Sequence, residues 1–287
     1  MSGDEQKLLD ASGDYRYAVR QGEPAAGAQW QTCRLVMTNR RLILATSDGK
    51  QTLPHGNIEL LDAADLPDEV DPDGATPLRI GENVVLVDVA DVADFDREYC
   101  RATLHGEVIL ANSPAVVGGV VQDDAAWRKS RFRLADDAIT LEFPDGEAVS
   151  FEIADVGTVE TERKSVMGEE RTVLEVEHTD AEDRSVESHL SGMERHTRAL
   201  QSLFETVIES REGDYELSEV ENQVLMALYS GVSPFEMADF VGIPVDEVEE
   251  IYQHLLDVGA VDAVRTRTEV TLNAQGRNMA SEAMNEQ

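Results

Sequence analysis

Cysteine is nearly absent from this 287-residue sequence, which contains only Cys33 and Cys100. Two cysteines are too few for a disulfide framework, so we expect a reduced, cytoplasmic protein. The sequence also lacks any run of the roughly 18 apolar residues that a membrane-spanning helix needs. It begins with the acidic stretch MSGDEQ, without the apolar core of a signal peptide. These absences predict neither secretion nor direct insertion into a membrane.

Positive charge is scarce as well. The chain has 24 basic and 58 acidic residues, which gives a formal net charge of −34. Only four of the bases are lysines: Lys7, Lys50, Lys129 and Lys164. An acid excess with little lysine is typical of a cytosol at molar salt, where carboxylates keep the protein surface hydrated. Because 41% of the residues are apolar, we expect folded cores, and the length indicates two or three domains.

Signatures of catalysis and of metal binding are also missing. The six histidines are scattered, and there is no His-Glu-x-x-His or Cys-x-x-Cys spacing for a metal. The stretch around Gly49 resembles a phosphate-binding loop only weakly, because Leu44 stands where that loop needs a glycine. No Gly-x-Ser-x-Gly motif is present either. We therefore expect a protein that is not an enzyme and that has no cofactor.

A repeat organises the first 212 residues. Trp30 and Trp127, the only tryptophans, stand 97 residues apart (127 − 30), and each is followed by an arginine at the fourth position. Both windows then read as strand, turn, strand, Asp-Gly turn and strand, which predicts a meander. Helical periodicity follows each copy, at 94–105 and, after a Ser191-x-x-Glu194 capping box, within 189–212. The pattern predicts a duplicated β-domain, each copy closed by a helix in a pleckstrin-homology-like layout.

The expected boundaries follow from this repeat. We place the first β-domain with its connecting segment at 1–122 and the second at 123–212. Within the first domain, the Asp- and Pro-rich residues 60–80 read as a solvated loop. Residues 112–124 read as the bridge between the copies, with a tight turn at Gly118-Gly119.

The last part of the chain, 213–287, has a different period. Capping boxes at Ser218 and Ser233 and a proline at position 244 predict three helices, and the alternation after position 260 predicts a two-stranded wing with a closing helix. The predicted fold class is thus α+β, with two tandem pleckstrin-homology-like domains followed by a winged helix-turn-helix domain.

Charge argues against DNA as the ligand of this last domain. The segment 218–287 has 13 acids against 3 arginines, and the third helix, at 244–258, has no lysine or arginine. Base and phosphate contacts depend above all on these two residue types. We therefore expect no nucleic-acid partner and interpret the domain as a protein-binding module. A winged-helix transcriptional regulator remains the alternative.

The most basic stretch of the chain contains Arg128, Lys129, Arg131 and Arg133. In one interpretation this strand holds a phosphoinositide head group, which would make the domain a lipid-binding module. In the other, the arginines line the solvent face of a strand whose Phe132 faces the core. With a net charge of −34 we favour the second, or contact with an acidic protein.

Several long segments resemble one family, the archaeal chemotaxis adaptor CheF. They include VLMALYSGVSPFEMADFVGIPVDEVEEIY (224–252), LNAQGRNMASEAMNEQ (272–287) and SPAVVGGVVQDDAAW (113–127), together with the strand pair WQTCRLVMTNRRLIL (30–44). The resemblance implies an adaptor that binds phosphorylated CheY and couples it to the switch complex at the cytoplasmic face of the archaellum motor. It also implies a homodimer, CheY binding by the C-terminal domain, and CheC- and CheD-type chemotaxis proteins as further candidate partners.

Two sets of residues are the candidate contacts under this hypothesis. For CheY we select large apolar or cationic side chains of the C-terminal domain: Phe235, Phe240, Tyr252, Arg277, Met279 and Met284. Core packing is the alternative for Phe240 and Tyr252. The basic stretch at 128–133 is the candidate contact with the motor or another acidic partner.

Overall fold

The structure, a computed structural model, describes residues 5–25, 27–123, 125–180, 182, 184–212, 217–257 and 261. The chain divides into two compact units, Met1–Gly213 and Asp214–Gln287, and each is described by itself. Among the described residues, no helix has the length and apolar character needed to cross a membrane.

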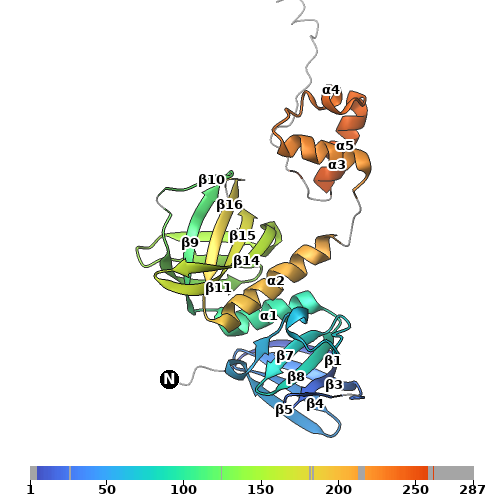
Figure 1. The fold of residues 1–287 in the computed structure, drawn as a ribbon, viewed down its shortest axis with the longest axis vertical. Coiled ribbons are helices and arrows are strands. Elements are labelled where there is room, and N and C mark those ends of the chain that lie inside the picture. The colour runs from blue at the N-terminus through green and yellow to red at the C-terminus, as the bar shows by residue number, and fades with distance from the viewer. Residues whose placement is uncertain are drawn as a thin grey trace, which may run out of the picture. The chain divides into compact units, whose positions relative to one another are not determined.

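The first unit contains two antiparallel sheets, each followed by a helix (Figure 1). The elements of the first sheet are β1 (Lys7–Arg20), β2 (Glu23–Pro24), β3 (Gln31–Thr38), β4 (Arg41–Thr46), β5 (Gly49–Pro54), β6 (Glu59–Leu60), β7 (Thr76–Ile80) and β8 (Asn83–Val89), with helix α1 (Val92–Leu104) after them. Those of the second are β9 (Val108–Val117), β10 (Val120–Val121), β11 (Arg128–Ala135), β12 (Ala138–Glu142), β13 (Ala148–Glu152), β14 (Val156–Val166), β15 (Glu169–Thr179) and β16 (Ser185–Ser191), with α2 (Glu194–Glu212).

The two sheets have the same strand order. It is β5-β4-β3-β1-β8-β7-β6 in the first and β13-β12-β11-β9-β16-β15-β14 in the second. In addition, the short strand β2 pairs with β1, and the short strand β10 pairs with β9. Strands β3 and β11 begin at Gln31 and Arg128, which stand 97 residues apart. The structure therefore confirms the duplicated β-domain and the α+β class. The pleckstrin-homology-like assignment stays a prediction.

The strand that opens the second sheet lies in a segment that we expected to connect the copies. Residues 108–117 form β9, which pairs with β11 and with β16. The sequence does not predict this strand, because small residues and a proline weaken its alternating pattern, although Ile109, Ala111 and Ala115 are buried. The expected tight turn is present, since Gly118 and Gly119 have φ of 55° and 78° between β9 and β10.

Residues 60–80 are also more ordered than a solvated loop. Leu61, Leu66 and Ala75 are buried in a separate apolar cluster with residues of β1 and β8. The segment then continues into β7, which pairs with β8. The many prolines and aspartates of this segment predict its turns. They do not predict that its few apolar residues cover one side of the sheet.

Helix α2 starts later than its predicted capping box. Ser191 ends β16, and its hydroxyl donates to the carbonyl of Thr172 at 2.7 Å, so it does not cap the helix. The helix begins at Glu194. The predicted capping box at this position is wrong, because Ser191 pairs with Leu110 of β9 and its hydroxyl bonds to the backbone of β15.

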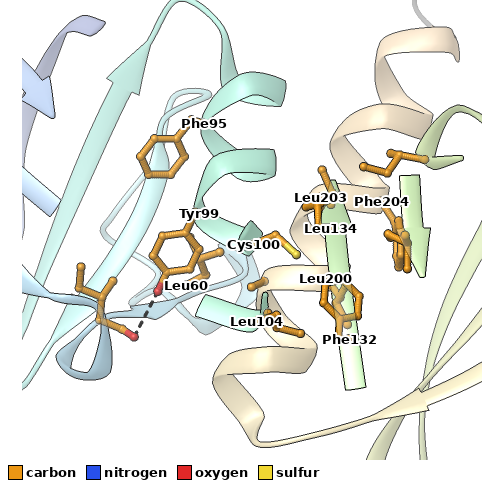
Figure 2. Close-up of a cluster of buried hydrophobic side chains, with 14 of the residues drawn as sticks. Leu60, Phe95, Tyr99, Cys100, Leu104, Phe132, Leu134, Leu200, Leu203 and Phe204 are labelled. Atoms are coloured by element: carbon orange, nitrogen blue, oxygen red, sulfur yellow. Dashed lines mark hydrogen bonds between the residues drawn. The ribbon is translucent and has the colours of Figure 1, made fainter. Parts of the chain in front are cut away.

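The two copies share one apolar core. Helices α1 and α2 pack against each other, and one cluster of buried residues includes side chains from both sheets. Figure 2 shows Cys100 and Leu104 of α1 between the two halves, facing Leu200 and Leu203 of α2. Burial on this scale is the main source of folding free energy, so we expect the two β-domains to be stable together.

A buried carboxyl links the two helices. Asp96 of α1 is 1% exposed and accepts hydrogen bonds from the hydroxyls of Ser202 (2.9 Å) and Thr206 (2.7 Å) of α2. Burial raises the pKa of the Asp96 carboxyl, since desolvation penalises the charged form. The two hydroxyl donors oppose that shift only in part.

The second unit is helical where it is described. Its helices are α3 (Glu219–Tyr229), α4 (Met237–Val241) and α5 (Val245–Asp257). The predicted capping box of α3 is confirmed: the Ser218 amide donates to Glu221 Oε2 at 2.8 Å, and the Glu221 amide donates to the Ser218 hydroxyl at 3.3 Å. Buried Val224, Met237, Val248 and Leu255 form the centre of its core.

The second predicted capping box of this unit is wrong. Ser233 precedes a turn, not a helix, and its hydroxyl accepts from the Phe235 amide at 3.4 Å. Helix α4 begins only at Met237 and ends at Val241; the next residue, Gly242, caps it with a φ of 80°, which suits a glycine. The expected wing and closing helix lie outside the described residues, so the winged-helix assignment stays a prediction.

Candidate functional site

Two aromatic side chains of the C-terminal unit lie in solvent. Phe235, in the turn before α4, is 84% exposed, and Phe240, on α4, is 64% exposed. Met237 and Val241 of the same short helix pack into the core, which leaves Phe240 on the flank. The alternative that Phe240 is a core residue is therefore wrong. Two exposed aromatic side chains on one small unit are candidate contacts, because buried aromatics dominate the binding energy of many interfaces.

Tyr252 has a different environment. Its ring packs against the helical core, and its hydroxyl donates to the carbonyl of Pro234 at 3.1 Å. The bond ties α5 to the turn that carries Phe235. Tyr252 thus positions the exposed aromatic turn. The other three candidates, Arg277, Met279 and Met284, lie outside the described residues.

Periodicity missed two further exposed apolar side chains in this unit. Met226 of α3 and Val245 at the start of α5 are both mostly exposed. Val245 follows the helical spacing of Val248 and Leu255, so its sequence position indicates burial. It is exposed because the core of this small unit does not reach the first turn of α5.

Helix α5 is acidic, as the sequence predicts. Asp246, Glu247, Glu249 and Glu250 are all exposed on a helix without lysine or arginine. This surface would repel a phosphate backbone, and the counterion release that drives DNA binding would not occur. The arrangement suits a protein partner better.

The basic stretch lies on β11, with alternating sides as the sequence predicted. Ser130, Phe132 and Leu134 are buried, and Lys129, Arg131 and Arg133 are exposed. This placement confirms that Phe132 faces the core.

Three of the four cations are engaged within the domain. Arg128 Nη1 pairs with Asp145 (2.9 Å) and Glu147 (2.7 Å), and its guanidinium lies 3.8 Å from the ring centre of Phe143. Arg131 donates to the carbonyl of residue 106 at 2.7 Å, and Arg133 donates to a glutamate of β12 at 2.5 Å. For the ammonium of Lys129, the described residues provide no hydrogen bond or ion pair. Lys129 is thus the cation of this stretch that remains available to a partner.

One cluster in the described part of the chain has the composition of a metal site. Ligand atoms of Glu175, Glu187 and His189 lie within 4.8 Å of one another on β15 and β16. However, Lys164 of β14 already forms an ion pair with Glu175, and His189 Nε2 lies 2.5 Å from Glu187 Oε1. The ammonium supplies the positive charge that a metal would bring, so this arrangement is a side-chain ion network.

Two of the histidines, His55 and His178, are buried within the β-domains. His178 stacks on Phe151 with ring centres 3.9 Å apart, and its Nε2 lies 2.8 Å from the Ser188 hydroxyl. Burial lowers the pKa of His178, and that of His55 in the first sheet, because desolvation disfavours the charged form. Their role is packing and hydrogen bonding.

Comparison with known proteins assigns the chain to a family. Residues 7–210 match the model "Archaeal Chemotaxis signal transduction system protein F", and residues 216–285 match "Domain of unknown function (DUF8579)". The chain is 38% identical over 291 residues to the Taxis protein CheF1 of Halobacterium salinarum, with all of both chains covered. The two β-domains described above thus correspond to the part that the first model matches. The chain belongs to the archaeal chemotaxis protein F (CheF) family.

Proposed function

We propose that the protein is an adaptor that binds phosphorylated CheY and couples it to the switch complex of the archaellum motor. Family membership supports a role in taxis signalling. The observation that carries the binding role is the exposure of Phe235 and Phe240 on the C-terminal unit. Each buried phenylalanine contributes about 1.5–3 kcal/mol, which is enough to distinguish two conformations of a partner.

Phosphorylation acts in this proposal through a population shift. The adaptor binds the active conformation of CheY better than the inactive one, and a tenfold preference needs about 1.4 kcal/mol. Burial of one aromatic ring in a pocket present only in the active form supplies that difference. The acidic α5 beside these aromatics favours a partner surface with arginine or lysine at its rim.

The alternatives have weaker support. A transcriptional regulator needs cations on α5, and that helix has none. A phosphoinositide site on β11 needs free arginines, and Arg128 and Arg133 are paired with carboxylates. Attachment at the cytoplasmic face of the motor, a homodimer, and CheC- and CheD-type partners remain parts of the proposal that follow from the family resemblance.

Calorimetry of the full chain with CheY from the same organism, in molar KCl, tests the proposal. Binding is expected to strengthen when beryllium fluoride mimics the phosphoryl group. Phe235→Ser and Phe240→Ser are each expected to weaken binding at least tenfold, about 1.4 kcal/mol. Val121→Ser removes a comparably exposed apolar side chain from β10 and is the matched control. Absence of binding with and without the mimic would exclude CheY as the direct partner.

A further inference from the structure

A groove in the second β-domain has features that neither the taxis role nor the aromatic pair explains. Its walls are the start of β9 with Val108, β11 with Lys129, the turn between β14 and β15 with Met167, β15 with Arg171, and the segment before α2 with Met193. The volume is about 330 Å³, at the lower end of the range for ligand pockets. We call it the methionine groove.

The rim of the methionine groove is apolar and exposed. Val108, Met167 and Met193 are 52%, 63% and 46% exposed, respectively. Together these three side chains form a small apolar rim that apolar side chains of a partner can contact. Methionine is common on such surfaces because its flexible, polarisable side chain adapts to different partners.

The backbone at Met167 makes this residue choice unusual. Met167 and Gly168 form a two-residue turn between the paired residues Val166 and Glu169, with φ of 52° and 88°. Positive φ at both central positions is the type I′ turn, which favours Asn-Gly. A methionine is disfavoured in the left-handed region, and Met167 gains no burial in return. A residue that is disfavoured by its backbone conformation and gains no burial is a candidate for a functional position.

The lining of the methionine groove has more basic than acidic side chains, although the chain has a net charge of −34. Lys129 has an unpaired ammonium as described above, and Arg171 pairs through Nη2 with Glu169 while its buried Nε has no acceptor in the described structure. Lys129 and Arg171 outnumber Glu169, the carboxylate in the described lining of the groove. They complement carboxylates on a partner.

The small size of this basic site favours a partner that contacts the groove alone. An anionic bilayer or a nucleic acid is large enough to face much of a chain whose net charge is −34, and not the groove alone. A single protein segment contacts only the groove and its two cations. At molar salt the Debye length is about 3 Å, so only charges in direct contact contribute.

We infer that the methionine groove binds an acidic protein segment that inserts apolar side chains between Met167 and Met193 and places carboxylates beside Lys129 and Arg171. This interaction surface is separate from the exposed aromatics of the C-terminal unit and does not depend on the identity of their partner.

Nuclear magnetic resonance of the full chain, labelled at the methionine methyl groups and held in molar KCl, tests the inference. The probes are three short synthetic peptides: one with aspartate and glutamate interleaved with leucine and phenylalanine, one with serine at every apolar position, and one with lysine at every acidic position. The first is expected to shift the methyl resonances of Met167 and Met193 and leave that of the exposed Met226 unchanged. The second and third are expected to bind at least tenfold more weakly.

Two substitutions locate the site. Met167→Asn removes the apolar side chain and suits the turn, so weaker binding cannot be attributed to misfolding. Lys129→Glu reverses the available charge. Each is expected to weaken binding of the first peptide at least tenfold. The controls are Lys50→Glu, at an exposed position of β5, and Val121→Ser, and each is expected to change the affinity less than twofold.

Four results would overturn the inference. The first is that no peptide shifts the methyl resonances, and the second is that the lysine peptide shifts them equally. The third is that anionic lipid vesicles shift them. The fourth is that the shifts follow protein concentration while light scattering gives the mass of a dimer. The last would make a second copy of this chain the occupant. None of these outcomes bears on CheY binding by the C-terminal unit, so the two proposals fail separately.

Discussion

The shared core between the two β-domains leads to a prediction about how they unfold. Leu104, at the end of α1, is fully buried and belongs by sequence to the first copy, yet it faces α2 and the second sheet (Figure 2). Leu104→Ala removes most of that side chain and leaves a cavity. Such substitutions cost about 2–5 kcal/mol. For a unit of this size each kcal/mol corresponds to roughly 2–4 °C, so we expect the midpoint to fall by roughly 4–20 °C.

The protein carries one natural reporter in each copy. Trp30 lies in the first β-domain, with the Arg16 guanidinium 5.0 Å from its ring centre, and Trp127 lies in the second, with its ring centre 6.2 Å from that of His189. Trp30→Phe and Trp127→Phe each leave one tryptophan, whose fluorescence can be excited without exciting the tyrosines. Thermal unfolding in molar KCl is expected to give the same midpoint for both reporters, and Leu104→Ala is expected to lower both by the same amount.

The reasoning would be refuted if Leu104→Ala lowered the midpoint seen by Trp30 and left that seen by Trp127 unchanged. It would also be refuted if the two single-tryptophan variants already differed before the substitution. Either result would mean that each β-domain has its own core and that the contact between α1 and α2 contributes little to stability.

Three further predictions concern single contacts. Because burial raises the folded-state pKa of Asp96, its favourable contribution is present below the unfolded pKa and is lost as pH rises through the folded value. Asp96→Asn, which keeps an acceptor for Ser202 and Thr206, is therefore expected to be more stable than the natural protein at pH 7, with a difference that shrinks toward pH 4 in denaturant titrations; a constant difference would contradict this. Tyr252→Phe is expected to cost about 0.5–1.5 kcal/mol and to weaken CheY binding through the displaced aromatic turn, measured by calorimetry. Met167→Asn is expected to raise the free energy of unfolding by roughly 1 kcal/mol, measured by urea titration, because asparagine tolerates the left-handed conformation.

Local features of the candidate site were predictable from the sequence. The capping box of α3 depends on Ser218 and Glu221, which stand three residues apart, so their side chains meet wherever the helix forms. The alternation on β11 is likewise a property of consecutive residues, and it placed Phe132 in the core correctly. The absence of cations on α5 needed no structure at all.

Other features of the sites required contacts between distant residues. The spacing of Phe240 fits both a core position and an exposed one, and only the packing of Met237 and Val241 decides between them. Four adjacent cations on β11 look equivalent in sequence. Carboxylates on β12 and on the segment after it neutralise Arg133 and Arg128, which leaves Lys129 available.

The sequence by itself determined that this protein has a duplicated β-domain, a helical C-terminal unit and an acidic surface. These conclusions depend on features that need no tertiary contact: the tryptophan spacing, the Asp-Gly turns and the composition. Tertiary structure alone decided that β9 belongs to the second sheet, that α1 and α2 close one common core, and that Met167 meets Val108 and Met193 at a groove. Strand pairing and burial depend on segments that lie tens of residues away in the sequence. A local pattern does not specify which of several compatible segments becomes the partner.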